Sequence, residues 1–338
     1  MSEPNDANRP YSALDPDCVL GALESLGLRP DGRFLALNSY ENRVYQVWME
    51  EDAAGGGTPA PLVVKFYRPA RWTDAQIREE HAFACELEDL EIPVCAPLVI
   101  GGDTLHEYRD FRFAVYPRRG GRAPELDDRE VLEWIGRFLG RIHAVGAAKP
   151  FEHRPALDIA SFGEEPREYL LASGFLPPEL VKPWTTIVDM ALVGVRNAFD
   201  RAGDVAKIRL HGDCHPGNIL WLPDEGPHFV DLDDCRTGPA VQDLWMLLSG
   251  DRQSQQRQLI DLLTGYEDFA EFDPRELHLI EALRTLRLIH YSAWIARRWD
   301  DPAFPAAFPW FGTQRYWEER VLELREQVAA MDEPPMVV

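Results

Sequence analysis

The chain has 338 residues, and its 45% hydrophobic content is enough for a sizeable core in one large domain or two coupled domains. Its formal net charge of −22 argues against a nucleic-acid-binding protein, because contacts with phosphate groups need a basic surface. Its five cysteines form no tight pairs and no zinc-like Cys/His set, which fits a reducing compartment better than a disulfide framework.

The beginning of the chain is polar and acidic over Met1–Pro10, a composition unlike that of a signal peptide. No run of eighteen apolar residues occurs, so the sequence predicts no membrane span. We therefore expect a cytoplasmic protein with neither a membrane partner nor a nucleic-acid partner.

The N-terminal part predicts a helix followed by strands. Residues 1–12 have the composition of a disordered lead, and residues 15–27 have the apolar period of a helix that opens at an Asp-Pro-Asp sequence. Residues 34–37 and 43–49 predict two strands, joined by a polar turn. The glycine triplet 55–57 lies between strands with no helix after it, so we interpret it as a flexible hairpin connection and not as a phosphate-binding loop.

A lysine stands inside the next apolar strand. Residues 62–67 are aliphatic or aromatic except for Lys65, and an unpaired buried charge is costly, so Lys65 needs an anionic partner. The helical pattern that follows, residues 76–90, carries Glu79 and Glu80 in its first half. Either glutamate is a candidate partner.

The middle of the chain changes from strands to helices. Residues 93–99 and 111–116 predict two more strands, and a turn-rich stretch ends near Gly121. Residues 131–145 form a strongly amphipathic pattern, and we interpret His143, which follows its apolar face, as a satisfied core residue.

The remaining helical patterns lie around an irregular connection. Residues 150–166 are irregular and charged, and residues 183–199 predict a further helix. The C-terminal part, residues 259–331, is helical and aromatic, with a final helix from Gln314. The aromatic stretch 302–311 is either a wall of a substrate site or an ordinary loop.

Chemistry-bearing residues gather in two stretches late in the chain. In the loop His211–Asn218, Asp213 and Asn218 are five positions apart, and the run Phe229–Asp234 ends on carboxylates. Phosphoryl transfer needs one carboxylate to accept the proton of the attacking hydroxyl, and an amide oxygen with a second carboxylate to hold the metal. The two stretches therefore indicate phosphoryl transfer.

These stretches, with Lys65 upstream, resemble the catalytic and metal loops of the aminoglycoside phosphotransferase and choline kinase group. The longer strings 211–221, 229–238 and 242–245 resemble the bacterial stress response kinase A (RdoA-like) Ser/Thr kinases, and the match runs from about Leu37 to Trp245. The resemblance implies an α+β, bilobal, protein-kinase-like fold. Its N-terminal lobe would hold an antiparallel sheet plus a helix, and its larger C-terminal lobe would be mainly helical.

The resemblance also implies how the chain divides. It predicts a nucleotide-binding lobe over residues 1–117 and a catalytic, substrate-binding lobe over residues 118–338, with the hinge near residues 116–121. In this pattern Asp213 is the general base or hydroxyl-orienting residue, and Asn218 and Asp231 hold Mg²⁺.

ATP is the second expected cofactor. The resemblance assigns the α- and β-phosphates to Lys65, and counting back from Ile92-Pro93-Val94 selects Glu80 over Glu79 as the residue that positions it. The remaining predicted nucleotide contacts are the phosphate-covering turn and the hinge backbone, represented by Ser39, Tyr40, Val115 and Tyr116.

Several departures from protein kinases bear on regulation. Gly212 replaces the arginine of the kinase catalytic loop, and only eleven residues separate Asp231 from Asp243, with no Ala-Pro-Glu string. The usual switch, a phosphate paired with that arginine, therefore lacks both of its parts. We expect Asp243 to bond the catalytic-loop backbone from a helix, while Asp233 supplements the metal site.

Three residues in or near the motif, His215, Cys214 and Cys235, have structural and functional interpretations that stay open. His211 takes the packing position of the kinase histidine, and His215 is either structural or a phosphate or substrate contact. Cys214 and Cys235 are either small buried residues or redox-active thiols.

Three functions are compatible with the sequence. The first is an ATP-dependent Ser/Thr protein kinase, acting as a monomer on a protein hydroxyl. The second is a small-molecule hydroxyl kinase for an amino alcohol, sugar or antibiotic. The third, a non-catalytic nucleotide-binding scaffold, is disfavoured because a scaffold would have no need of the complete residue set.

Overall fold

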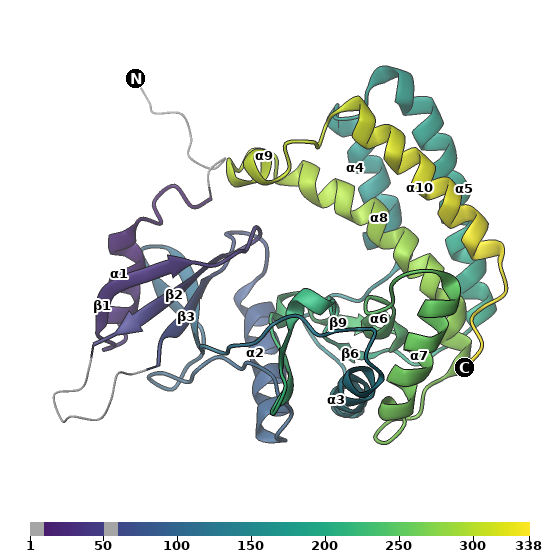
Figure 1. Cartoon of the computed structure of the whole chain (residues 1–338). Coiled ribbons are helices and arrows are strands. Elements are labelled where there is room, and N and C mark those ends of the chain that lie inside the picture. The colour runs from purple at the N-terminus through teal and green to yellow at the C-terminus, as the bar shows by residue number, and fades with distance from the viewer. Residues whose placement is uncertain (1–9, 51–59) are drawn as a thin grey trace. The chain divides into compact units, whose positions relative to one another are not determined.

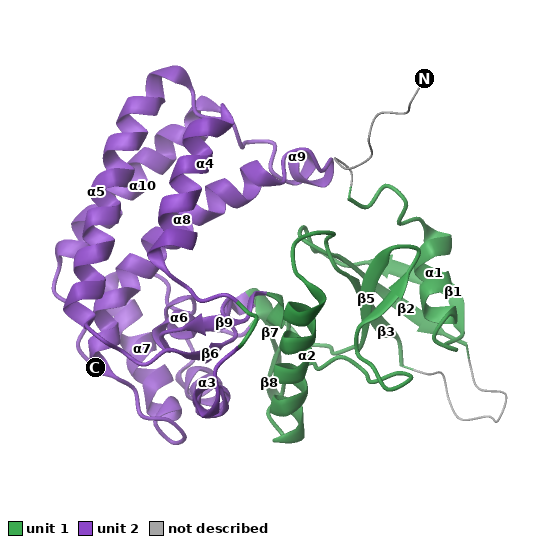
Figure 2. Ribbon diagram, turned by 180° about the vertical axis from the view of Figure 1, so that it is seen from behind, with its two compact units in different colours: residues 1–123, 152–154, 217–233 green, residues 124–151, 155–216, 234–338 purple. Residues whose placement is uncertain are grey.

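The computed structural model describes residues 10–50 and 60–338. The described residues form two compact units (Figure 2). Unit 1 contains the described part of residues 1–123 together with 152–154 and 217–233, and unit 2 contains 124–151, 155–216 and 234–338. Most of the predicted disordered lead, and the whole glycine triplet 55–57, lie outside the described residues.

Unit 1 is built on a five-stranded antiparallel sheet with the order β1-β2-β3-β5-β4 (Figure 1). Its strands are β1 (Pro30–Ala36), β2 (Arg43–Met49), β3 (Leu62–Phe66), β4 (His106–Tyr108) and β5 (Phe111–Pro117). In the centre of the sheet, Lys65 on β3 stands opposite Val44 on β2 and Ala114 on β5. The lysine is thus held by ladders on both sides.

The predicted strand over residues 93–99 is wrong. This segment forms only an isolated bridge, between Val94 and Phe229. Pro93 and Pro97 have no N–H group to donate to a ladder, so a regular strand is disfavoured here.

Two helices complete the N-terminal part of unit 1. Helix α1 (Pro16–Glu24) is capped by Asp15, whose carboxylate accepts the Cys18 N–H at 2.7 Å, as its opening sequence predicts. Helix α2 (Asp74–Asp89) begins with a capping box in which Thr73 and Gln76 bond each other's backbone N–H groups. One core cluster joins α1 to the sheet through residues that include Val19, Leu23, Val64, Phe66 and Phe113.

A hairpin from much later in the chain also belongs to unit 1. Strands β7 (Ile219–Leu222) and β8 (Gly226–Phe229) pair with each other, and the hairpin is joined to earlier residues by the Val94–Phe229 and Arg122–Trp221 bridges. Short 3₁₀ turns at Pro216–Asn218 and Leu232–Asp234 flank the hairpin.

Unit 2 is mainly helical (Figure 1). Its α-helices are α3 (Arg129–Ala148), α4 (Glu165–Ser173), α5 (Pro178–Ala202), α6 (Val241–Trp245), α7 (Arg252–Tyr266), α8 (Ile280–Arg297), α9 (Ala303–Ala307) and α10 (Gln314–Asp332). A two-stranded sheet pairs β6 (Ile208–Leu210) with β9 (Arg236–Gly238). The five-stranded sheet of unit 1 and the helices of unit 2 confirm the predicted α+β class.

Two predicted boundaries in unit 2 need correction. Helix α5 begins at Pro178, so Pro183 lies inside it. The carbonyl that Pro183 leaves without a donor belongs to the exposed Glu179, where solvent can satisfy it, so the interruption is tolerated. The stretch predicted to be irregular contains a π-helical turn, Ala160–Glu164, that leads into α4.

The aromatic stretch 302–311 belongs mostly to the core of unit 2. Phe304, Phe308 and Phe311 are buried in one cluster with residues of α5, α8 and α10. Trp310 is the exception, with 41% of its surface exposed. The stretch is thus not an ordinary loop, since it contains α9, and its buried aromatic residues do not support the prediction of a substrate wall.

Close packing of α3 against α7 depends on glycine. A Cβ on Gly265 would lie 1.9 Å from the Glu133 carbonyl oxygen, and one on Gly136 would lie 2.0 Å from the Leu262 carbonyl oxygen. Only glycine permits this approach of the two backbones. It brings His143 of α3 beside Tyr266 of α7, where the two side chains bond at 3.0 Å.

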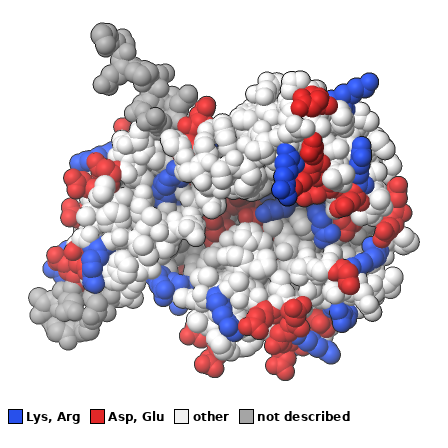
Figure 3. All heavy atoms as spheres, turned by 45° about the horizontal axis from the view of Figure 1, so that its top comes forward, with Lys and Arg blue, Asp and Glu red and all other residues white. Residues whose placement is uncertain are grey.

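Acidic and basic side chains are interspersed on the face drawn in Figure 3. None of the helices in residues 10–50 and 60–338 combines the length and apolar character that crossing a membrane requires.

Candidate active site

A cavity of about 330 Å³ lies within unit 1, in the size range of small-molecule sites. Its wall is apolar over one part and charged over another. The lining residues are Leu37, Asn38, Ser39, Val44, Val63, Lys65, Glu80, Ala84, Cys95, Pro97, Tyr116, Pro117, Arg119, Gly217, Asn218, Leu220, Val230, Asp231 and Leu232.

Lys65 is the centre of the charged part of this wall. Its Nζ lies 2.9 Å from Asp231 Oδ1, 3.2 Å from Asp233 Oδ1 and 3.7 Å from Glu80 Oε1. Burial alone would lower the pKa of Lys65, but the three carboxylates raise this pKa well above its usual value. Lys65 is therefore a fixed cation, with the carboxylate partners that the sequence predicts it to need.

The structure distinguishes the two candidate glutamates on α2. Glu80 is buried and faces Lys65, whereas the carboxylate of Glu79 accepts hydrogen bonds from the backbone of residues 152–154. Burial raises the pKa of Glu80 to about 7, against the attraction of Lys65. Its Oε2 has no hydrogen-bond partner among the described residues, which agrees with this direction.

Asp233 is a major member of the cluster. It is 3% exposed, and its Oδ2 accepts hydrogen bonds from Asn42, at 3.0 Å, and from Arg71. Its other oxygen faces Lys65. Both oxygens of the Asp233 carboxylate are therefore occupied by neighbouring side chains, mainly Lys65 and Arg71. This arrangement does not support the expectation that Asp233 supplements the metal site.

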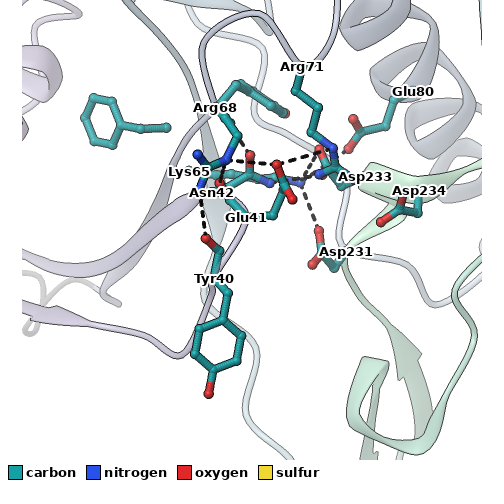
Figure 4. A network of polar contacts seen from close by, with 12 residues as sticks. Tyr40, Glu41, Asn42, Lys65, Arg68, Arg71, Glu80, Asp231, Asp233 and Asp234 are labelled. Atoms are coloured by element: carbon teal, nitrogen blue, oxygen red, sulfur yellow. Dashed lines mark hydrogen bonds and ion pairs between the residues drawn. The ribbon is translucent and has the colours of Figure 1, made fainter. Parts of the chain in front are cut away.

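The turn between β1 and β2 joins the same network (Figure 4). Glu41 Oε1 lies 2.9 Å from Arg68 Nε and 3.8 Å from Arg71 Nε. Asn42 accepts the Arg68 N–H at 3.1 Å while donating to Asp233. Arg68 and Arg71 were not predicted from the sequence, although the basic run just after the Lys65 strand is the signal that could have found them.

Asp231 differs from Asp233 in backbone and exposure. Its φ of +61° is a conformation that non-glycine residues rarely adopt, and such strain clusters at functional sites. Its side chain is 51% exposed, so the carboxylate can reach both Lys65 and a ligand in the cavity.

The cavity wall provides oxygen ligands for Mg²⁺, and the phosphates of a bound nucleotide would have to provide further ligands. Asn218 and Asp231 provide amide and carboxylate oxygens on its wall, the ligands that Mg²⁺ prefers. Within residues 10–50 and 60–338, no group of three or more His, Cys, Asp or Glu side chains could hold a metal ion. One or two carboxylates plus substrate phosphates is the usual magnesium environment of kinases, so the residues fit the metal.

The remaining predicted nucleotide contacts divide into two groups. Ser39 and Tyr116 line the cavity, and the Tyr116 ring is fixed by a 2.9 Å bond between its hydroxyl and that of Tyr67. Tyr40 and Val115 do not line it. Val115 is fully buried in the sheet, and its carbonyl accepts the Leu98 N–H at 2.7 Å.

The first part of the predicted catalytic loop, residues 211–216, lies in unit 2 and is organised by Asp243. This fully buried carboxylate on α6 accepts the backbone N–H groups of His211 and Gly212, each at 2.8 Å. His143 contacts it at 3.1 Å. Burial would raise the pKa of Asp243, but the bonds and charge of His143 and the loop lower it overall. The predicted roles of Asp243 and of His143 as a satisfied core residue are confirmed.

Gly212 cannot be replaced by a larger residue without moving the loop. Its φ is +84°, and a Cβ there would lie 2.2 Å from the Asp234 carbonyl oxygen. Both facts require glycine, which explains physically why the arginine of protein kinases is absent from this position.

Asp213 is partly exposed and has a basic partner that the sequence did not reveal. Arg287, on α8, donates to its Oδ1 at 2.6 Å, and His215 Nε2 lies 3.6 Å from its Oδ2. Since Arg287 follows Asp213 by seventy-four positions, no local sequence motif predicts this pair.

The neighbouring thiol at Cys214 is fully buried, and burial raises its pKa well above the usual value, with Asp243 and Asp213 adding to the effect. This favours the structural interpretation of Cys214.

The profile of the phosphotransferase enzyme family matches residues 33–280. Stress response kinase A of Escherichia coli strain K12 is 45% identical over 332 residues, which make up 98% of this chain and 98% of that protein. A Salmonella typhimurium protein named serine/threonine protein kinase RdoA is 44% identical over the same shares of both chains.

Two solved structures have similar folds. Amicoumacin kinase hAmiN, in complex with AMP-PNP, Ca²⁺ and Ami, has a TM-score of 0.68 and 17% identity, covering 93% of each chain. A microcompartment-associated aminopropanol kinase has a TM-score of 0.67 and 17% identity, covering 93% of this chain and 96% of that one. These likenesses confirm the predicted kinase-like fold.

Proposed function

We propose that this chain, which belongs to the phosphotransferase enzyme family and within it to the stress response kinase A family, transfers the γ-phosphoryl group of ATP to a Ser or Thr hydroxyl of a protein. Unit 1 would bind the nucleotide, and unit 2 would provide the catalytic loop and receive the acceptor. With five free cysteines, the enzyme would act in the cytoplasm.

The observation that carries the proposal is the Lys65 cluster. A lysine fixed on a central strand, with Glu80 from a helix behind it and Asp231 at 2.9 Å, is the arrangement that positions nucleotide phosphates in kinases. When a nucleotide enters the cavity, Lys65 would bind its phosphates while Asp233 and Glu80 retain its ammonium group.

Proton transfer is assigned to Asp213. Its carboxylate is partly exposed and hydrogen-bonded to Arg287, so the protein fixes its orientation. In that orientation it would accept the proton of the attacking hydroxyl, or orient that hydroxyl for attack. Asp243 holds the backbone that carries it.

Mg²⁺ would be held by Asn218 and Asp231, and when bound it neutralises charge on the phosphates. Asp231 would exchange part of its contact with Lys65 for the metal, which its exposure and left-handed backbone favour.

The test is incubation of the purified chain with γ-labelled ATP and MgCl₂. One arm contains a generic protein acceptor such as myelin basic protein, a second contains a panel of sugars and amino alcohols, and a third contains no acceptor. Asp213→Asn is the control in every arm. Label transferred to protein Ser or Thr supports the proposal, label on small alcohols alone replaces it with a small-molecule kinase, and no transfer with retained ATP binding identifies a scaffold.

A further inference from the structure

Three residues next to one another in the sequence, 152–154, bind the outer side of α2. The carboxylate of Glu79 accepts the backbone N–H of Glu152 at 2.6 Å, of His153 at 2.8 Å and of Arg154 at 2.6 Å. Three consecutive amides around one carboxylate form an anion-binding nest. We call residues 152–154 the strap.

The strap has further contacts around the start of α2. Gln76 Nε2 donates to the His153 carbonyl at 3.1 Å. The guanidinium of Arg154 lies 4.1 Å from the centre of the Trp72 ring. Arg154 is 5% exposed and also donates to the Asp233 carbonyl oxygen, in the loop that contains Asp231. The strap thus binds the helix and the loop that both supply partners to Lys65.

The contacts of the strap bear on which of the two glutamates of α2 faces Lys65. Consecutive residues of a helix point about 100° apart, so a rotation of α2 by about that angle would turn Glu79 toward Lys65 in place of Glu80. Gln76 and Glu79 are three apart and share a face, and the strap occupies that face. Its three amides stabilise the ionised Glu79, whose pKa is lowered by these bonds despite the opposing effect of burial.

We infer that the strap fixes the rotation of α2, so that Glu79 is withheld from Lys65 and Glu80 is presented to it. Glu79 and Arg154 are then positioning residues for phosphoryl transfer, acting through Glu80 and through the Asp231 loop. The inference rests on the proposed role of Lys65 in binding ATP. Since the strap forms within the fold itself, the Lys65–Glu80 pair would be made before any nucleotide arrives.

A double-mutant cycle tests this coupling. Variants Glu79→Ala, Glu80→Ala and the double variant are compared with the parent chain by calorimetric titration with ATP and MgCl₂ and by initial rates at several ATP concentrations. We expect Glu79→Ala to lower kcat/KM for ATP about tenfold, because a small misplacement of a positioning group is costly. In the Glu80→Ala background the same change should cost less than about twofold, because the residue through which it acts is gone.

Matched controls separate positioning from general structure. Glu88→Ala removes an exposed glutamate from the same helix and should leave the ATP parameters unchanged. Glu79→Asp keeps the charge and should recover part of the loss, and hydrogen exchange at the amides of residues 152–154 should be faster in Glu79→Ala than in Glu79→Asp. Equal effects of Glu79→Ala in both backgrounds would overturn the inference. Failure of Lys65→Ala to weaken ATP binding would instead overturn the proposed nucleotide site.

Discussion

The two units use buried carboxylates in opposite ways. In unit 1, Glu80 and Asp233 bind charged side chains, and the cluster around Lys65 is a network of cations and anions. In unit 2, the buried Asp243 binds mainly the backbone of the catalytic loop, together with His143. Removing a carboxylate from unit 1 changes the charge that a ligand meets, whereas removing one from unit 2 changes whether the loop keeps its shape.

Exposure divides the carboxylates in a second way that applies within each unit. Asp231 and Asp213, the two carboxylates proposed to meet the substrates, have partly exposed side chains, and each has one close basic partner. The carboxylates behind them are almost completely buried. Substitutions of the exposed pair should therefore affect catalysis without unfolding the chain, and substitution of the buried Asp243 should affect stability first.

The largest expected effect is that of Asp231→Ala on activity. Loss of a magnesium ligand should reduce turnover at least about a thousandfold, because metal stabilisation of the phosphates supplies several kcal/mol. The chain should remain folded, since Lys65 keeps Glu80 and Asp233 as partners. Initial rates with MgCl₂, together with thermal unfolding, measure the two quantities.

Alanine at position 231 also has to adopt the left-handed backbone, so Asp231→Asn is the matched control because Asn tolerates this region better. It should be equally inactive and closer to the parent in stability. Activity near that of the parent chain in either variant would remove Asp231 from the site.

For Asp243→Ala we expect a large loss of stability, in contrast to Asp231→Ala. Two backbone N–H groups and His143 would lose their acceptor in a buried place, which should lower the free energy of unfolding by about 3 kcal/mol. Denaturant titration of the parent, Asp243→Ala and Asp243→Asn measures this. A variant with unchanged stability and lost activity would contradict the division between the units.

The third effect is intermediate and lies within the Lys65 cluster. Lys65→Ala should lower kcat/KM for ATP about a hundredfold, and Glu80→Ala about tenfold, because the first removes the phosphate contact and the second only its support. Rates at varied ATP concentration measure both. If Glu80→Ala proved the more damaging, Glu80 would have a role beyond holding Lys65.

The part of the site that could be predicted consists of local motifs. Three features can be recognised because each lies in a short, patterned stretch: Lys65 in an apolar strand, Glu80 on the next helix, and the spacing of Asp213 and Asn218. The N-terminal caps of α1 and α2 can be recognised for the same reason, because each is formed by residues close together in the sequence. The structure places Lys65 against Glu80, the pair that the resemblance implied, and adds the contact between Lys65 and Asp231.

The remaining contacts depend on residues far apart in the chain. The bond between Arg287 and Asp213, the Arg71–Asp233 pair and the strap on Glu79 each join segments with no common period. Side-chain pairing of this kind is set by tertiary packing, which leaves no repeat in the sequence to detect. For the same reason, no pattern in the sequence indicates that the hairpin of β7 and β8 belongs to unit 1.

The smallest expected effect concerns regulation. In protein kinases a phosphate orders the activation segment through an arginine of the catalytic loop. Here that position is Gly212, where no side chain fits, and the segment after Asp231 is held otherwise. Arg236 donates to the Asp234 carbonyl at 2.9 Å and to its carboxylate at 2.8 Å, and β9 pairs with β6. The segment is thus ordered by unmodified residues.

We therefore expect full activity without prior phosphorylation. The purified chain is treated with a broad-specificity phosphatase, shown by mass spectrometry to be unmodified, freed of the phosphatase and assayed at once. Its initial rate should equal that of an untreated sample, because Arg236 already supplies the charge pairing that a phosphate would otherwise provide. Arg236→Met sharpens the test, since loss of that pairing should lower the rate of treated and untreated samples equally. A lag that disappears on preincubation with ATP would show instead that modification assembles the site, and that the contacts around Arg236 are insufficient to do so.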